Sequence, residues 1–188
     1  LESAYRSLNL LPDGIYAGGN GKYRVSRDQG FSWAGPYNAS FGNRNELIQS
    51  IHKNANGDLV FMARSGVLWL DTADGQRIYP SLFESGTAGR GGLLLGTSGP
   101  AFLYGADGMV RISTDGGRSW IPSDLRLKDT EIFSHARSED YLFLGGSGRY
   151  TGQFRFAGVE TLLNESGAPV GKRALFERGP QSRYSPAL

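Results

Sequence analysis

The chain has 188 residues, enough for one or at most two domains. Its 20 lysines and arginines against 18 aspartates and glutamates leave a formal charge of +2, a balance that argues against nucleic acid or an anionic membrane as the partner. It contains no cysteine, which excludes disulfides, thiolate metal sites and cysteine nucleophiles.

Residues 3–37 predict the first group of short strands. Polar and apolar residues alternate in "KYRVS" (residues 22–26), as is typical of a half-buried strand. The preceding "AGGNGK" (residues 17–22) opens no helix, so it predicts a hairpin loop rather than a phosphate site. The group ends in the turn "VSRDQGFSW" (residues 25–33).

Residues 45–84 predict a second group with the same order of strands and turns. Its strands are expected at about Leu47–His52, Leu59–Ala63, Val67–Asp71 and Arg77–Phe83. The turn "LDTADGQRI" (residues 70–78) is a degenerate copy of the first turn, with Gly75 in the place of Gly30.

Two further groups follow, at residues 90–125 and 130–178. The first contains "ISTDGGRSW" (residues 112–120), a full copy of the turn, and the second contains "FRFAGVETL" (residues 154–162), an eroded one. The aligned glycines recur at intervals of 41 to 45 residues, which is room for four short strands. They are Gly30, Gly75, Gly117 and Gly158.

This period predicts an all-β fold. Four-stranded antiparallel sheets repeated around an axis form a β-propeller, which leaves only short sheet edges unpaired. We expect one domain over residues 1–188 with about four blades and a short C-terminal tail at 179–188. Because four blades lie at the low end of the usual range, the chain forming part of a larger propeller stays open.

The pattern Ser-x-Asp-x-Gly-x-Ser-Trp resembles the Asp-box, or BNR repeat, of sialidase-like β-propellers. The aspartate is expected to accept backbone N–H bonds, the glycine to take a positive φ and the tryptophan to pack between blades. One or two carboxylates per loop cannot supply the roughly 6–8 oxygens that calcium takes, so the turn is predicted to be structural. Its residues are Ser26, Asp28, Gly30, Trp33, Ser113, Asp115, Gly117 and Trp120.

The resemblance implies a fold but not an activity. A sialidase of this family has an arginine cluster, a Tyr–Glu pair and an Arg-Ile-Pro signature, whereas this chain has "RIYP" (residues 77–80) and "WIPS" (residues 120–123). No pair of carboxyl groups stands out for glycoside hydrolysis, and two histidines without carboxylates make a poor metal site. We therefore expect no enzyme activity, cofactor or metal, with a glycan-binding or sialidase-like hydrolase as the alternative.

The favoured hypothesis is a propeller that binds a protein, for example as an inhibitor or an assembly factor. The resemblance places the binding surface on the face opposite the repeated turns, with loops at 37–46, 84–92, 105–108 and 147–151. Arginine and tyrosine are enriched at binding hot spots. The candidate residues are Tyr37, Arg44, Glu84, Arg90, Asp107, Arg149 and Tyr150. A second alternative is half of a larger propeller, completed by another chain.

No apolar run approaches the roughly 20 residues of a transmembrane helix. The sequence starts at Leu1 rather than Met, and we interpret it as a mature or trimmed form. An extracytoplasmic location, secreted or periplasmic, is expected.

Overall fold

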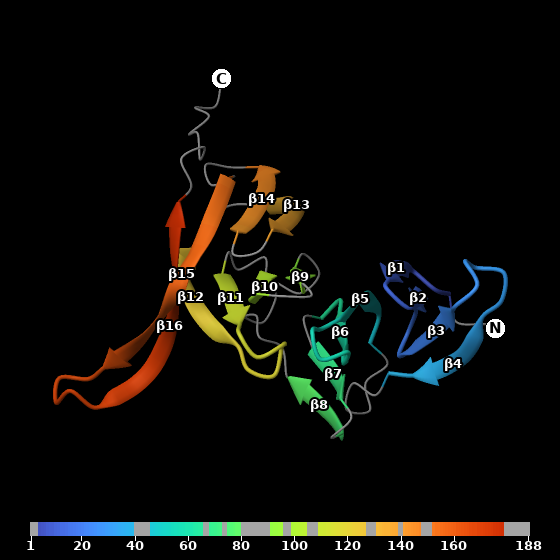
Figure 1. Cartoon of the computed structure of the whole chain (residues 1–188), viewed down its shortest axis with the longest axis horizontal. Coiled ribbons are helices and arrows are strands. Elements are labelled where there is room, and N and C mark those ends of the chain that lie inside the picture. Colours follow the sequence, from blue (N-terminus) through green and yellow to red (C-terminus); the bar gives the residue numbers. More distant parts are fainter. Residues whose placement is uncertain are drawn as a thin grey trace. The chain divides into compact units, whose positions relative to one another are not determined.

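The computed structural model describes residues 4–39, 46–65, 68–72, 75–79, 91–95, 99–104, 109–126, 131–138, 141–147 and 152–178. The chain divides into two compact units, Leu1–Gly89 and Arg90–Leu188. Every regular element within the described residues is a β-strand (Figure 1). None of these residues belongs to a helix long and apolar enough to cross a membrane.

The first unit contains two antiparallel sheets of four strands, and in each sheet the strands follow one another in chain order. This confirms the predicted repeat of four-stranded groups. The first sheet consists of β1 (Ser7–Leu11), β2 (Gly14–Gly18), β3 (Lys22–Ser26) and β4 (Ala34–Asn38). The second consists of β5 (Ile48–Lys53), β6 (Leu59–Ala63), β7 (Leu68–Thr72) and β8 (Gly75–Tyr79).

Backbone hydrogen bonds join the two sheets of the first unit. The loop between β2 and β3 lies against the start of β5, where Ile48 N donates to Gly19 O at 3.0 Å and Gly21 N donates to Glu46 O at 2.7 Å. A β-bridge between Asn20 and Leu47 lies beside them. The glycine-rich "AGGNGK" segment is therefore a hairpin loop, as predicted, and it also positions the neighbouring sheet.

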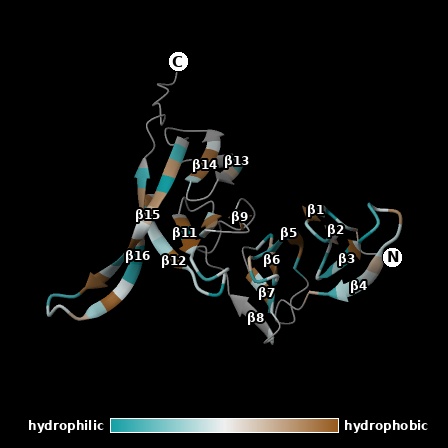
Figure 2. Ribbon diagram, viewed as in Figure 1, coloured by the Kyte–Doolittle hydropathy of each residue, from teal (hydrophilic) through white to brown (hydrophobic). Residues whose placement is uncertain are grey.

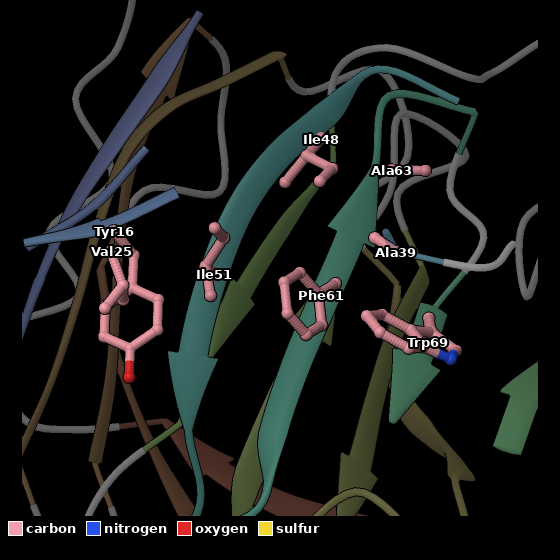
Figure 3. Packing of buried hydrophobic residues seen from close by; sticks show 8 residues of the cluster. All are labelled: Tyr16, Val25, Ala39, Ile48, Ile51, Phe61, Ala63 and Trp69. Carbon is pink, nitrogen blue, oxygen red and sulfur yellow. The ribbon is translucent and has the colours of Figure 1, made fainter. Parts of the chain in front are cut away.

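Side chains from both sheets form the hydrophobic core of this unit. Figure 3 shows Tyr16 and Val25 of the first sheet alongside Ile51 and Phe61 of the second. Removing such apolar surface from water contributes roughly 25 cal/mol per Å², so the core holds the two sheets together. Its buried members are Tyr16, Val25, Ala39, Ile48, Ile51, Phe61, Ala63 and Trp69.

The second unit contains one sheet of eight strands in the order β13-β14-β15-β16-β12-β11-β10-β9. Two four-stranded groups, each in chain order, are joined through their last strands, β12 and β16. The first group is β9 (Gly92–Leu94), β10 (Ala101–Tyr104), β11 (Met109–Ser113) and β12 (Ile121–Arg126). The second is β13 (Glu131–Ser138), β14 (Tyr141–Ser147), β15 (Gly152–Leu163) and β16 (Pro169–Arg178).

The junction of β12 and β16 differs from the separate blades that the sequence predicts. The two strands run parallel and pair at Ser123 and Ala174, and Phe176 N donates to Asp124 Oδ1 at 3.2 Å. The physical reason is strand length, because β15 and β16 have 12 and 10 residues whereas the last strands of the other groups have five or six. A hairpin of this length reaches the edge of the neighbouring group.

The predicted fourth copy of the turn, at residues 154–162, is wrong. These residues lie within β15, and Gly158 stands at a bulge in its pairing with β16. The chain reverses later, at residues 164–168, where the Asn164 side chain accepts the N–H groups of Ser166 and Ala168. Figure 2 shows hydrophobic and hydrophilic residues in succession along this long hairpin.

The second copy of the turn is shortened. Strand β8 begins at Gly75, three residues after the end of β7 at Thr72, so a tight hairpin replaces the longer turn. Thr72 Oγ1 donates to Gly75 O at 2.7 Å across this hairpin. Among the described turns, those at residues 25–33 and 112–120, which match the full pattern, have its serine–aspartate and serine–glycine hydrogen bonds.

Candidate functional site

The repeated turn after β3 is held by the side chains of Ser26 and Asp28. Ser26 Oγ donates to Asp28 Oδ1 at 2.8 Å and accepts the N–H of Gly30 at 2.7 Å. Asp28 also accepts the N–H of Ser32 at 2.9 Å and the hydroxyl of Ser32 at 2.5 Å. The turn thus folds around one carboxylate and one hydroxyl.

The turn after β11 has the same hydrogen bonds. Ser113 Oγ donates to Asp115 Oδ1 at 2.7 Å and accepts the N–H of Gly117 at 2.7 Å. Asp115 accepts the N–H groups of Arg118 and Ser119 at 3.0 and 2.8 Å. The same serine, aspartate and glycine at the same spacing therefore form the same Ser–Asp and Ser–Gly hydrogen bonds in the two turns.

These hydrogen bonds stabilise the charged carboxylates. The hydroxyl and N–H of Ser32, followed by the Ser26 hydroxyl, lower the pKa of Asp28 to about 2. Burial alone would raise the pKa of Asp115, but bonds from Ser119, Ser113 and Arg118 lower it from its usual value. A carboxylate that accepts several hydrogen bonds has few oxygen lone pairs left, which favours a structural role over metal binding.

The two tryptophans of the turns differ in their partners. Both are half-buried, and Trp33 Nε1 donates to Gly30 O at 3.1 Å within its own turn. Among the described residues, Trp120 Nε1 is buried and has no hydrogen-bond partner. Trp33 therefore belongs to the hydrogen-bond network of its own turn.

A cavity of about 390 Å³ lies beside the first turn. Ligand sites in proteins usually have volumes of about 300–1,000 Å³ and mostly apolar walls. Strands β2, β3 and β4 and the turn supply most of the lining, and Leu59 at the start of β6 completes it. The lining residues are Tyr16, Tyr23, Val25, Arg27, Asp28, Ser32, Ala34, Tyr37 and Leu59.

Three tyrosines give the cavity its chemical character. The rings of Tyr16 and Tyr23 are stacked, with centroids 6.4 Å apart, and those of Tyr23 and Tyr37 lie 5.3 Å apart. Tyr23 also packs against Phe61 of the core at 4.9 Å. The row of rings therefore begins in the core and ends at Tyr37, which is 44% exposed.

The Asp13 carboxylate, which is charged, orients Tyr16. The Tyr16 hydroxyl donates to Asp13 Oδ2 at 3.0 Å, and the same oxygen accepts Lys53 Nζ at 2.9 Å and Arg27 Nη1 at 3.3 Å. Burial, together with Asp13, raises the pKa of Tyr16 to about 12. Burial would raise the pKa of Asp13, but Lys53 and Tyr16 lower it, so the carboxylate stays charged.

Tyr37 is the one predicted binding residue that the structure describes. The sequence predicts Tyr37 in a loop on the face opposite the repeated turns. In the structure it lies in β4 and lines a cavity together with Asp28 and Ser32 of the first turn. Tyr37 belongs to β4 and pairs with Tyr23 of β3, whereas the pair next to the turn is Val25 and Ala34. The other predicted binding residues lie outside the described residues: Arg44, Glu84, Arg90, Asp107, Arg149 and Tyr150.

Sequence reasoning missed Tyr16 and Tyr23 as parts of a site. The signal that could have found them is the register of neighbouring strands. Tyr16 pairs with Val25 across β2 and β3, and Tyr23 pairs with Tyr37 across β3 and β4. Aromatic residues at matching positions on neighbouring strands lie side by side on one face of a sheet. This register could be read only once the strand ends were known.

A polar pair in the second unit joins β10 to β13. Tyr104 Oη and His135 Nδ1 are hydrogen-bonded, and their rings lie 5.2 Å apart. Burial raises the pKa of Tyr104 to about 12 and lowers the pKa of His135 from its usual 6.5. Within the described part of the chain, no group of three histidine, aspartate or glutamate side chains could hold a metal ion.

Comparisons with solved protein structures identify the fold of this chain. No family model matches the sequence, and no curated protein matches it. The structure described as "YCF48 bound to D1 peptide" is 20% identical, with a TM-score of 0.55 over 77% of this chain and 48% of that chain. Hsv2p of Kluyveromyces lactis is 15% identical, with a TM-score of 0.49 over 89% of this chain and 52% of that chain.

A third structure, YCF48 from Cyanidioschyzon merolae, is 12% identical, with a TM-score of 0.39 over 78% of this chain and 67% of that chain. The chain spans about half the length of the first two structures. The likeness to the first, together with the antiparallel four-stranded groups, confirms the β-propeller fold.

Proposed function

We propose that this chain is a non-catalytic β-propeller that binds another protein. The observation that carries the proposal is the cavity whose wall is a row of three tyrosines. Tyrosine supplies large contact area with little loss of conformational freedom, and it is enriched where protein interfaces gain most of their energy.

A structure with the same fold supports this proposal. That propeller, 20% identical, is described with a bound D1 peptide. A shared fold is weak evidence for a shared function, so the cavity and not the likeness carries the argument. The six predicted binding residues outside the described part of the chain stay predictions.

In this proposal the repeated turns are Asp-box turns with a structural role. The first one frames the cavity, because Asp28 and Ser32 line it while their mutual hydrogen bonds hold the backbone in place. The second forms the same hydrogen bonds from Ser113 and Asp115. Because this network recurs in both units, we assign it to the blade.

Site-specific photo-cross-linking tests the function. A photo-reactive phenylalanine analogue at position 37 should cross-link one protein partner reproducibly, because this side chain is exposed at the cavity. The matched control carries the analogue at Phe143, which is 38% exposed and lies in the second unit. Equal labelling at both positions, or none at either, would contradict the proposal.

A second candidate is that two copies of the chain complete a larger propeller. The observation that favours it is that the match covers only 48% of the similar propeller. Light scattering after gel filtration should then give twice the monomer mass. A monomer at all concentrations would exclude the pairing of two copies.

A further inference from the structure

The hydroxyl groups of the cavity determine which partner chemistry it can satisfy. Among the described residues, the hydroxyls of Tyr23 and Tyr37 have no hydrogen-bond partner, whereas that of Tyr16 donates to Asp13. Burial raises the pKa of Tyr23, and the Asp71 charge adds to this, so its hydroxyl keeps its proton. The cavity therefore offers two phenolic donors beside flat aromatic surface.

The carboxylate on the cavity wall already accepts hydrogen bonds from the turn. The Asp28 carboxylate accepts bonds from Ser26 and from both the N–H and the hydroxyl of Ser32. The Ser32 hydroxyl points its proton at this carboxylate. A hydrogen-bond donor on a ligand would therefore compete with these bonds for the Asp28 oxygens.

The charges of the wall do not favour a charged ligand. The Arg27 guanidinium is paired with Asp13 and also donates to the backbone carbonyl of that residue at 3.1 Å. Asp28 keeps its negative charge nearby, since its pKa is about 2. Asp28 would repel an anion and Arg27 would repel a cation, so the complementary ligand is neutral.

We propose that this cavity binds a proline-rich segment of the partner in the polyproline II conformation. Proline has no backbone N–H, and polyproline II leaves its carbonyl oxygens without internal hydrogen bonds. Such a segment brings acceptors for the Tyr23 and Tyr37 hydroxyls and apolar rings for the tyrosine faces, and grooves lined by aromatic residues bind it elsewhere. This inference rests on the proposed protein-binding function.

Titration of the ¹⁵N-labelled full chain with a synthetic polyproline peptide tests the inference. Saturable shifts are expected at the amides of Ala34, Tyr37 and Ser32, and a glycine–serine peptide of equal length should cause none. Tyr37→Ala should weaken binding about tenfold or more, and Tyr37→Phe, which keeps the ring, by about two- to tenfold. The control variant Phe143→Ala should bind as the parent does.

Thermal melts of the variants ensure that loss of binding is not loss of folding, and Tyr37→Phe removes a single hydroxyl from an exposed side chain. The inference is overturned if polyproline causes no saturable shift, if Tyr37→Ala binds equally well, or if a methyl glycoside shifts the cavity amides instead. If polyproline fails while position 37 still cross-links a protein, only the ligand assignment falls. If both fail, the proposed function falls with it.

Discussion

At the scale of single residues, the serine of the repeated turn is the most deeply buried of its polar side chains. Ser26 and Ser113 are each 1% exposed, whereas Asp28 and Asp115 are exposed. The serine hydroxyl accepts a hydrogen bond from the glycine N–H and donates one to the aspartate carboxylate. The turn therefore depends on a buried hydroxyl as much as on the aspartate that the pattern makes conspicuous.

Ser113→Ala should lower the free energy of unfolding by about 1–3 kcal/mol, because it leaves the buried N–H of Gly117 without a partner. Ser119→Ala is the matched control and should cost about 0.5 kcal/mol or less, since its hydroxyl is exposed and water replaces the lost bond. Urea unfolding at constant m-value measures both. Equal costs for the two variants would show that the buried hydroxyl is not what holds the turn.

The Asp28 carboxylate should make stability depend on pH in the acidic range. Hydrogen bonds lower its pKa from 3.8 to about 2, so the folded state favours the charged form more than the unfolded state does. The stability it contributes is fully present above about pH 4 and is lost as the pH falls towards about 2. In melting curves, Asp28→Asn should be less stable than the parent at pH 7, and the gap should narrow below pH 4. A gap that stays constant down to pH 2 would contradict this.

At the scale of elements, the strand predictions for the second group differ in accuracy. For the predicted strand Arg77–Phe83, the structure has β8 at Gly75–Tyr79, and residues 80–83 lie outside the described residues. The predicted strands Leu47–His52 and Leu59–Ala63 match β5 and β6 to within one residue, because alternation and turn residues mark both ends. The sequence did not predict the length of the β15–β16 hairpin. Its strands continue through Gly158, which the sequence presents as a turn residue but which a β-bulge accommodates instead.

A core substitution tests whether β12 and β16 pack against each other. Ala174 is fully buried there, so Ala174→Leu should cost about 1–3 kcal/mol by forcing extra volume into a closed site. Val170→Leu lies on the same hairpin at a position 64% exposed, and it should change stability by less than about 0.5 kcal/mol. Chemical denaturation compares the two. If Ala174→Leu is neutral, the strands are not packed together in solution.

The candidate site was predictable only in part, for a physical reason. Tyr37 could be found because tyrosine is enriched at binding hot spots, but its neighbour Tyr23 comes from β3 and the rest of the lining includes residues of β2 and β6. Which face of a strand a residue occupies follows from register, and a shift by one residue reverses it. Sequence alone therefore named one of the three tyrosines that line the cavity.

At the scale of the whole molecule, each unit has its own hydrophobic core. The first contains Phe61 and Trp69, and the second contains Phe102, Leu142 and Phe154. The sequence repeat predicted equal blades in one domain, but it carried no information on how blades group, because that depends on which side chains meet. The single-domain assignment stays a prediction, and the two cores provide the means to test it.

Hydrogen exchange of core variants measures whether the two units unfold separately. Phe61→Ala removes a fully buried ring from the first core, at a cost of about 3–5 kcal/mol. If the units are separate cooperative bodies, protection should fall at β2 and β6 and remain at β10 and β14. Phe102→Ala, equally buried in the second unit, should give the reverse pattern. Uniform loss of protection in both variants would show instead that the cores unfold together, as one propeller domain.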